Sequence, residues 1–131
     1  MDDIYDHCAL KEEITDHVID LGRVSETEKQ SLIKNSIALV QPSTNESFSI
    51  VLMEAWQYER PVIVHSDCAV TKQHVIDSNA GFYFSNSSEL AAIIKTCINQ
   101  PDLTDTLGRN GREYVKTKYS WGAVVLSLIH I

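Results

Sequence analysis

The fold is decided by residues 37–55, which read Ile-Ala-Leu-Val-Gln-Pro-Ser-Thr-Asn-Glu-Ser-Phe-Ser-Ile-Val-Leu-Met-Glu-Ala. The apolar run 37–40 is typical of a strand that is buried on both faces, as in a parallel sheet, and Pro42 ends it. A polar loop then covers 41–46, and a helix is expected over 47–58. This succession of buried strand, loop and helix predicts a βαβ unit of an α/β domain.

The same alternation continues on both sides of this segment. Ser25 and Glu28 form a capping box, which opens a helix that should reach about Asn35. We therefore predict an α/β fold with a Rossmann-like parallel sheet and helices on both of its faces. The further elements are expected as helices at 1–17, within 67–79, at 87–99, at 101–118 and from 120, and as strands at 18–21, 61–64 and 81–84.

Composition narrows the function class. The chain has 131 residues, which is the length of one domain, and a net charge of −7, which argues against a sequence-independent nucleic-acid binder. No apolar run approaches the ~20 residues of a membrane span. Cys8, Cys68 and Cys97 stand apart, without the spacing of a zinc site or a disulfide framework. We expect a cytoplasmic protein with reduced thiols, no metal and no nucleic-acid partner.

The loop and helix start after residue 40 can hold an anion. Ligands of open α/β sheets bind at the carboxyl ends of the strands. If the helix begins near residue 47, its first amides are free, and the helix dipole favours a negative group beside them. A phosphate needs no basic side chain there. These amides belong to Ser47, Phe48, Ser49 and Ile50.

Two carboxylates flank this anion site. Glu46 lies in the loop, and Glu54 follows after seven intervening residues, inside the helix. This separation is too large for two carboxyl groups that share a proton, so it does not indicate a paired-carboxylate hydrolase. The separation suits two acids that hydrogen-bond hydroxyl groups on either side of a diphosphate.

The segment from Glu46 to Glu54 resembles the Glu-x7-Glu signature of retaining GT-B glycosyltransferases of family 4, the glycosyl transferases group 1. The resemblance covers roughly residues 17–124 and implies the C-terminal, donor-binding domain of such an enzyme. The other matching segments, in chain order, are Leu21-Gly22-Arg23-Val24-Ser25, Pro42-Ser43, Glu54-Ala55 through Pro61-Val62, Gly81-Phe82 and Tyr119-Ser120-Trp121.

The resemblance also implies a role for each site residue. Glu46 would be the catalytic-site acid that binds the donor sugar, and the amides of residues 47–50 would hold the sugar and the distal phosphate. Glu54 would accept hydrogen bonds from the ribose, and the main chain at Arg23 and Val24 would contact the base. Such an enzyme transfers a hexose from a nucleotide diphosphate sugar to an acceptor with retention of configuration, and needs no metal or other cofactor.

One residue departs from the family. Ser49 stands where the family often has glycine, so its Cβ narrows the approach of the sugar to the backbone.

The family's acceptor domain and its diphosphate-binding Arg and Lys come before the matching region. We therefore expect residues 1–131 to be one truncated nucleotide-sugar-binding domain that is inactive alone, and membrane association of the full-length enzyme stays open. Residues 126–131 are either a native apolar helix or a non-native tail, since they resemble translated sequencing adapter.

An alternative is a non-catalytic α/β module, either a degenerate glycosyltransferase homologue or a receiver-like domain. A receiver needs a phosphorylatable aspartate at the end of one strand and a lysine at the end of a later one. Asp67, shortly after the predicted strand 61–64, is the one candidate for that aspartate.

Overall fold

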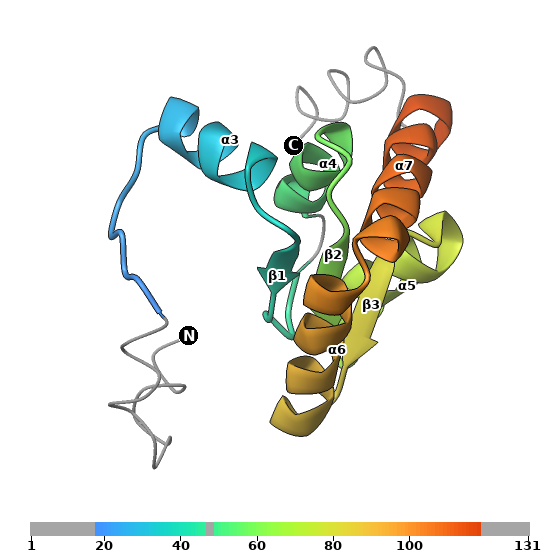
Figure 1. Ribbon diagram of the computed structural model, residues 1–131. Helices are drawn as coiled ribbons and strands as arrows, with labels where there is room; N and C mark the ends of the chain where they lie inside the picture. The colour runs from blue at the N-terminus through green and yellow to red at the C-terminus, as the bar shows by residue number, and fades with distance from the viewer. Residues whose placement is uncertain (1–17, 47–48, 119–131) are drawn as a thin grey trace.

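The computed structural model describes residues 18–46 and 49–118, and its centre is a parallel sheet (Figure 1). The strands are β1 (Leu39–Gln41), β2 (Val62–His65) and β3 (Gly81–Phe84), in the spatial order β1-β2-β3. Leu39 lies opposite Val62, which lies opposite Gly81 on its other side. Each strand is joined to the next through a helix, as parallel pairing requires. The parallel pairing confirms the predicted sheet.

Helices cover both faces of the sheet, as predicted. On one face, side chains of α4, α5 and α7 pack with Val62 and Val64 of β2 in the larger core. On the other face, α6 packs against Ile63 and Phe84 through Cys97. The helices are α3 (Glu26–Lys34), α4 (Ile50–Gln57), α5 (Ala69–Ser78), α6 (Ser87–Asn99) and α7 (Pro101–Lys118). Among the described helices, none is both long and apolar enough to cross a membrane.

Trp56 is the centre of the larger core. Its side chain is fully buried, and its indole Nε1 donates a hydrogen bond of 3.1 Å to the carbonyl oxygen of Ala80. Tyr114 of α7 packs edge-on against the indole, with ring centroids 5.5 Å apart. A buried indole N–H needs an acceptor, so this bond fixes α4 to the turn that precedes β3.

The predicted N-cap at the start of α3 is present, with the Ser25 half of the capping box formed. Ser25 is the N-cap in an extended conformation, and its Oγ accepts a hydrogen bond of 3.1 Å from the Glu28 amide. The Ser25 hydroxyl in turn donates to the Glu28 carboxylate at 3.0 Å. At the other end of the helix, the Arg60 guanidinium donates to the carbonyl oxygen of Lys34 at 3.0 Å.

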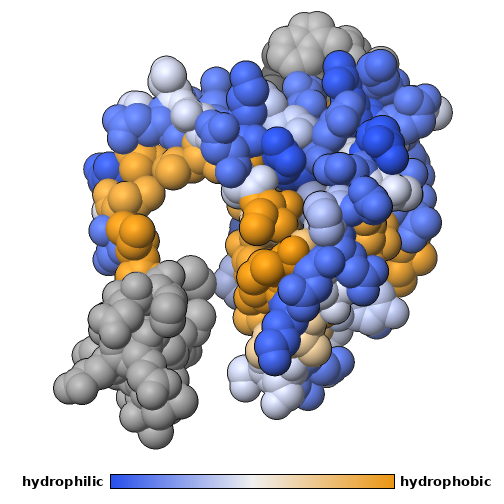
Figure 2. Space-filling model, in the orientation of Figure 1, coloured by the Kyte–Doolittle hydropathy of each residue, from blue (hydrophilic) through white to orange (hydrophobic). Residues whose placement is uncertain are grey.

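The predicted strand at 18–21 is wrong. These residues form no strand in the structure, and Ile19 is 81% exposed. An apolar run becomes a strand only where a neighbouring strand pairs with it, and the described sheet offers none here. The predicted turn after it does form: Gly22 has φ +62°, and its amide donates to Asp20 Oδ1 at 2.9 Å. Figure 2 shows hydrophobic side chains on this segment and on the part of the molecule that faces it.

The run 37–40 is less buried than predicted. Ile37 is 53% exposed, Val40 is 38% exposed, and the strand itself spans Leu39–Gln41. The register explains this, because Val40 lies beside Ile63 and so points to the face that α6 covers. Since α6 packs on β3, at the far side of the sheet, it leaves the β1 edge partly open to solvent.

Candidate functional site

The loop that follows β1 lies at the carboxyl edge of the sheet and is held by its own polar side chains. The Ser43 amide donates to Gln41 Oε1 at 3.4 Å, and the Asn45 amide donates to Ser43 Oγ at 3.3 Å. Such local bonds from side chain to backbone are typical of polar turns. They link the backbone of the loop between β1 and Glu46 to its own polar side chains.

Glu46 is half-buried, and its backbone is tied to the next βα unit. The Cys68 thiol donates to the carbonyl oxygen of Glu46 at 3.7 Å, and Cys68 is itself the N-cap residue of α5. Burial alone would raise the pKa of this thiol, but hydrogen bonds with Thr71 and with the backbone outweigh that effect and lower it. The contact places the start of α5 directly beside the loop.

The helix after the loop begins later than predicted. Ile50 is its first residue, and Ser49 is an extended, buried N-cap whose side chain makes no capping hydrogen bond. Leu52 N–H donates to the Ser49 carbonyl at 3.2 Å, so the amides left without a partner in the helix are those of Ile50 and Val51. Ser47 and Phe48 lie outside the described residues. Because serine is a preferred N-cap, Ser49 itself was the signal that the prediction missed.

Glu54 lies in the second turn of α4 and forms an ion pair with α3. Lys29 Nζ donates to Glu54 Oε1 at 3.4 Å and is 3.3 Å from Oε2. The same ammonium group donates to Glu26 Oε1 at 2.8 Å. Sequence reasoning gave no role to Lys29, since the lysine is 25 residues from Glu54 along the chain. These contacts connect the predicted ribose-binding acid to the helix that follows Arg23 and Val24.

Arg23 and Val24 lie just before the N-cap of α3. Arg23 is exposed, whereas Val24 is half-buried and lines a hollow of about 340 Å³ with side chains from α3. Lys29, the ion-pair partner of Glu54, belongs to the same helix α3 but does not line this hollow. The full set of residues that line it is Leu21, Val24, Glu28, Ser31 and Leu32.

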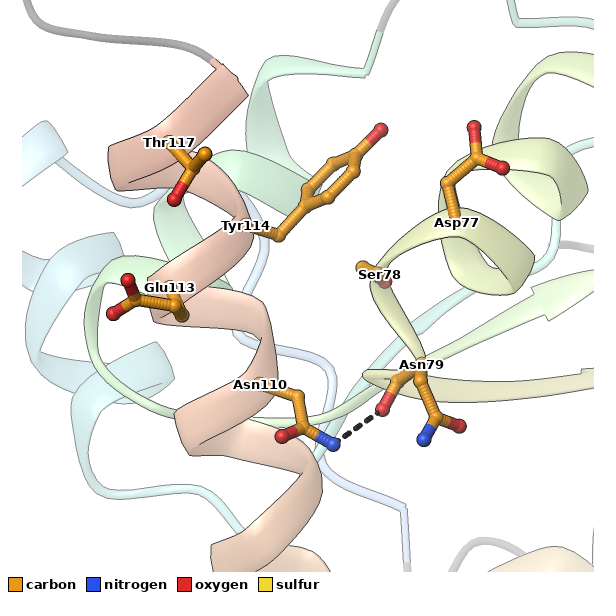
Figure 3. A pocket seen from close by; sticks show the side chains of 7 residues that line it. All are labelled: Asp77, Ser78, Asn79, Asn110, Glu113, Tyr114 and Thr117. Atoms are coloured by element: carbon orange, nitrogen blue, oxygen red, sulfur yellow. Dashed lines mark hydrogen bonds between the residues drawn. The ribbon is translucent and has the colours of Figure 1, made fainter.

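A second hollow lies between α5 and α7, away from the predicted site residues (Figure 3). It has a volume of about 320 Å³, and Figure 3 shows side chains of both helices around it. Asn110 of α7 donates to the carbonyl oxygen of Asn79 at 2.9 Å, and Asn79 ends α5 in a left-handed conformation. This bond caps the end of a helix, as expected at a left-handed C-cap, so we assign it a structural role.

Asp67, the receiver candidate, is exposed and lies two residues beyond the end of β2. Its amide donates to His65 Nδ1 at 3.0 Å, and the His65 ring packs edge-on against Phe84. Within the described ranges, no three His, Cys, Asp or Glu side chains are grouped as metal ligands would be. The expectation of a metal-free site stays a prediction.

Comparison with known proteins identifies the family. The model of the glycosyl transferases group 1 family matches residues 2–114. The chain belongs to this family. The match confirms the predicted group 1 membership. It therefore argues against the receiver-like alternative.

Relatives of this glycosyltransferase domain come from distant organisms. An uncharacterized glycosyltransferase of Methanocaldococcus jannaschii is 34% identical over 114 residues, which are 86% of this chain and 32% of the relative. Glycosyltransferase 1 domain-containing protein 1 of Xenopus tropicalis is 29% identical over 111 residues, 85% of this chain and 32% of the relative. The chain therefore spans about a third of the length of these relatives.

Solved structures agree with the fold. Sucrose-phosphate synthase from Thermosynechococcus elongatus matches with a TM-score of 0.80 and 25% identity, over 97% of this chain and 32% of its own. WaaG, a glycosyltransferase involved in lipopolysaccharide biosynthesis, matches with a TM-score of 0.69 and 22% identity, over 87% of this chain and 31% of its own. The predicted α/β fold of GT-B glycosyltransferases is thereby confirmed.

Proposed function

We propose that this domain binds the donor of a retaining family 4 glycosyltransferase, a nucleotide diphosphate sugar, at the carboxyl edge of its sheet. The observation that carries the proposal is the join between β1 and α4. There a polar loop ends in Glu46, the free amides of Ile50 and Val51 follow, and Glu54 lies one turn further along. At this edge of the domain, two carboxylates that can accept hydrogen bonds from sugar hydroxyls thus lie on either side of a helix start that can bind an anion.

Each group has a chemical task in this proposal. The α4 amides and dipole stabilise the diphosphate as negative charge develops on it, without a metal. Glu46 orients the hexose through its hydroxyls, and Glu54 accepts from the ribose. The main chain at Val24, which lines the hollow beside α3, contacts the base together with the main chain at Arg23. On the family resemblance alone, we assign the amides of Ser47, Phe48 and Ser49 to the sugar and the distal phosphate.

Transfer to an acceptor requires more than this domain. The chain spans about a third of its relatives' length, and we propose that an acceptor domain in the same enzyme completes the active site. The domain alone is then expected to bind the donor weakly and to transfer nothing. Transfer of hexose by the 131-residue chain alone would contradict this part of the proposal.

Calorimetric titration with UDP-glucose and GDP-mannose tests the donor site. We expect one of the two to bind the parent chain, and Glu46→Gln and Glu54→Gln each to weaken it about tenfold, as for loss of a hydrogen bond to a charged group. Glu113→Gln is the matched control, because Glu113 is exposed on α7 and lies at the second hollow. The proposal is wrong if the folded parent binds neither sugar nucleotide, or if Glu54→Gln binds like the parent.

A further inference from the structure

Lys29 of α3 forms an ion pair with Glu54, the acid proposed to bind the ribose of the donor. Its ammonium lies between two carboxylates, at 2.8 Å from Glu26 Oε1 and at 3.3 and 3.4 Å from the two oxygens of Glu54. The Lys29 side chain is 35% exposed and that of Glu54 only 25%. An ion pair on an open surface contributes little, but this one joins two helices at a partly buried acid.

The helix that carries Lys29 is held in place independently of the ion pair. Ile33, one helical turn further on the same face of α3, is buried in the core beside residues of α4. Arg60 then holds the end of α3 through the Lys34 carbonyl. Because residues four apart share a helix face, the Ile33 anchor directs Lys29 toward α4. The lysine therefore meets Glu54 as a pre-positioned partner.

The two oxygens of Glu54 differ in their surroundings. Oε2 is buried and makes no hydrogen bond with the described residues, so the nearby charge of Lys29 is its compensation. Oε1 accepts one long bond from Lys29 at 3.4 Å and has lone-pair capacity for a further donor. Without the ammonium group beside it, this buried oxygen would have no compensation, and the rotamer that places it there would be disfavoured.

We propose that Lys29 is a positioning residue for donor recognition, which holds the Glu54 carboxylate in the rotamer that presents Oε1 to the ribose hydroxyls of a nucleoside diphosphate. The inference rests on the proposed function, because it takes Glu54 as the ribose acceptor. Lys29 acts on the ribose only through Glu54. Its bond to Glu26 raises the pKa of the ammonium, with the Glu54 charge adding to the effect, so Lys29 stays charged at neutral pH.

The experiment compares Lys29→Met, which removes the charge at similar length, with Lys29→Arg, which keeps it. Each variant of the 131-residue chain is titrated with UDP and GDP and with their 2′,3′-dideoxy forms, which lack the hydroxyls that Glu54 would bind. Lys34→Met is the control, since Lys34 is an exposed lysine on the same helix. Unfolding midpoints are measured in parallel.

We expect Lys29→Met to weaken binding of the ribonucleotide about fivefold to tenfold, a typical coupling between contacting residues. Binding of the dideoxy form should stay unchanged, and Lys29→Arg should remain within about twofold of the parent. Equal or tighter ribonucleotide binding by Lys29→Met overturns the inference, and so does an equal loss for both forms, which would mean a merely structural role. If the parent does not distinguish the two forms, the ribose role of Glu54 fails, and the inference fails with it.

Discussion

Gly111 of α7 lies directly against the indole ring of Trp56. A Cβ at this glycine would be 2.1 Å from Trp56 Cδ1, closer than any real contact, and the Trp56 side chain is fully buried. The indole is held in this position, because its Nε1 donates to the Ala80 carbonyl and Tyr114 packs against it in a T-shaped contact. Glycine is therefore required here for close packing of α4 and α7, although it is a weak helix former.

We predict that Gly111→Ala lowers the free energy of unfolding by about 1 to 3 kcal/mol, the usual cost of overpacking a core. In an exposed helix the same change would stabilise by about 1 kcal/mol, so the sign of the effect is informative. Urea unfolding followed by circular dichroism measures it. Asp105→Ala, at an exposed position of α7, serves as control and should shift the free energy by less than about 0.5 kcal/mol. A more stable Gly111→Ala variant would contradict the close packing.

The capping box of α3 leads to a second prediction. Ser25→Ala removes the acceptor for the Glu28 amide and the hydroxyl bond to the Glu28 carboxylate. We expect a loss of about 1 kcal/mol, typical of a lost N-cap, with faster hydrogen exchange in the amides of α3. Ser88→Ala, at an exposed position of α6, removes a hydroxyl without removing a cap and should leave exchange in α3 unchanged. Unchanged exchange in Ser25→Ala would show that the cap does not hold the helix.

Much of the fold could be predicted because its signals are local. The apolar runs that became β2 and β3, the N-cap at Ser25 and the glycine turn at Gly22 each follow from a few neighbouring residues. The errors came where burial depends on distant packing. Residues 18–21 carry a strand pattern without a strand beside them, and Val40 is exposed because α6 packs on β3.

The candidate site was predictable to a similar extent. The order of loop, Glu46 and helix follows from the sequence, and the structure shifts the helix start to Ile50. The contacts of Glu54 with Lys29 and of Glu46 with Cys68 join residues that are far apart in the chain. No local pattern indicates such pairs, because they depend on how α3 and α5 dock against α4 and the loop.

The pH dependence of stability provides a third prediction. His74 of α5 is half-buried, and its Nδ1 lies 2.9 Å from the Tyr114 hydroxyl. Burial lowers its pKa, the negative charge of Asp77 raises it and the positive charge of Lys118 lowers it, with a net decrease. The unfolded chain, with a histidine pKa of about 6.5, then binds more protons than the native state as the pH falls below that value. Stability attributable to His74 is therefore complete above pH ~6.5 and is lost as the pH falls through the lower native pKa.

We expect the free energy of unfolding of the parent to fall more steeply than that of His74→Gln as the pH decreases from 7 to 5. Urea midpoints at intervals across this range measure the difference, and the remaining histidines contribute equally to both proteins. His65→Gln is the comparison variant, since His65 lies at the end of β2, away from Tyr114. Parallel curves for the parent and His74→Gln would contradict the role assigned to burial.

The two buried cysteines of the described region should differ in reactivity. Cys68 and Cys97 are only 2% and 3% exposed, so an alkylating reagent reaches either only when the structure opens locally. Burial raises the pKa of Cys97, which lies in α6 and packs against the sheet. Burial also acts to raise the pKa of Cys68, but hydrogen bonds with Thr71 and with the backbone outweigh it and lower that pKa. Since the thiolate is the reactive form, we expect iodoacetamide to modify Cys68 first, as followed by peptide mass spectrometry.

Because the Cys68 thiol bonds to the Glu46 carbonyl, a bound nucleotide sugar should slow its modification and leave Cys97 unaffected. Faster reaction at Cys97, or equal protection of both thiols, would show that the loop before α4 does not open independently of the core.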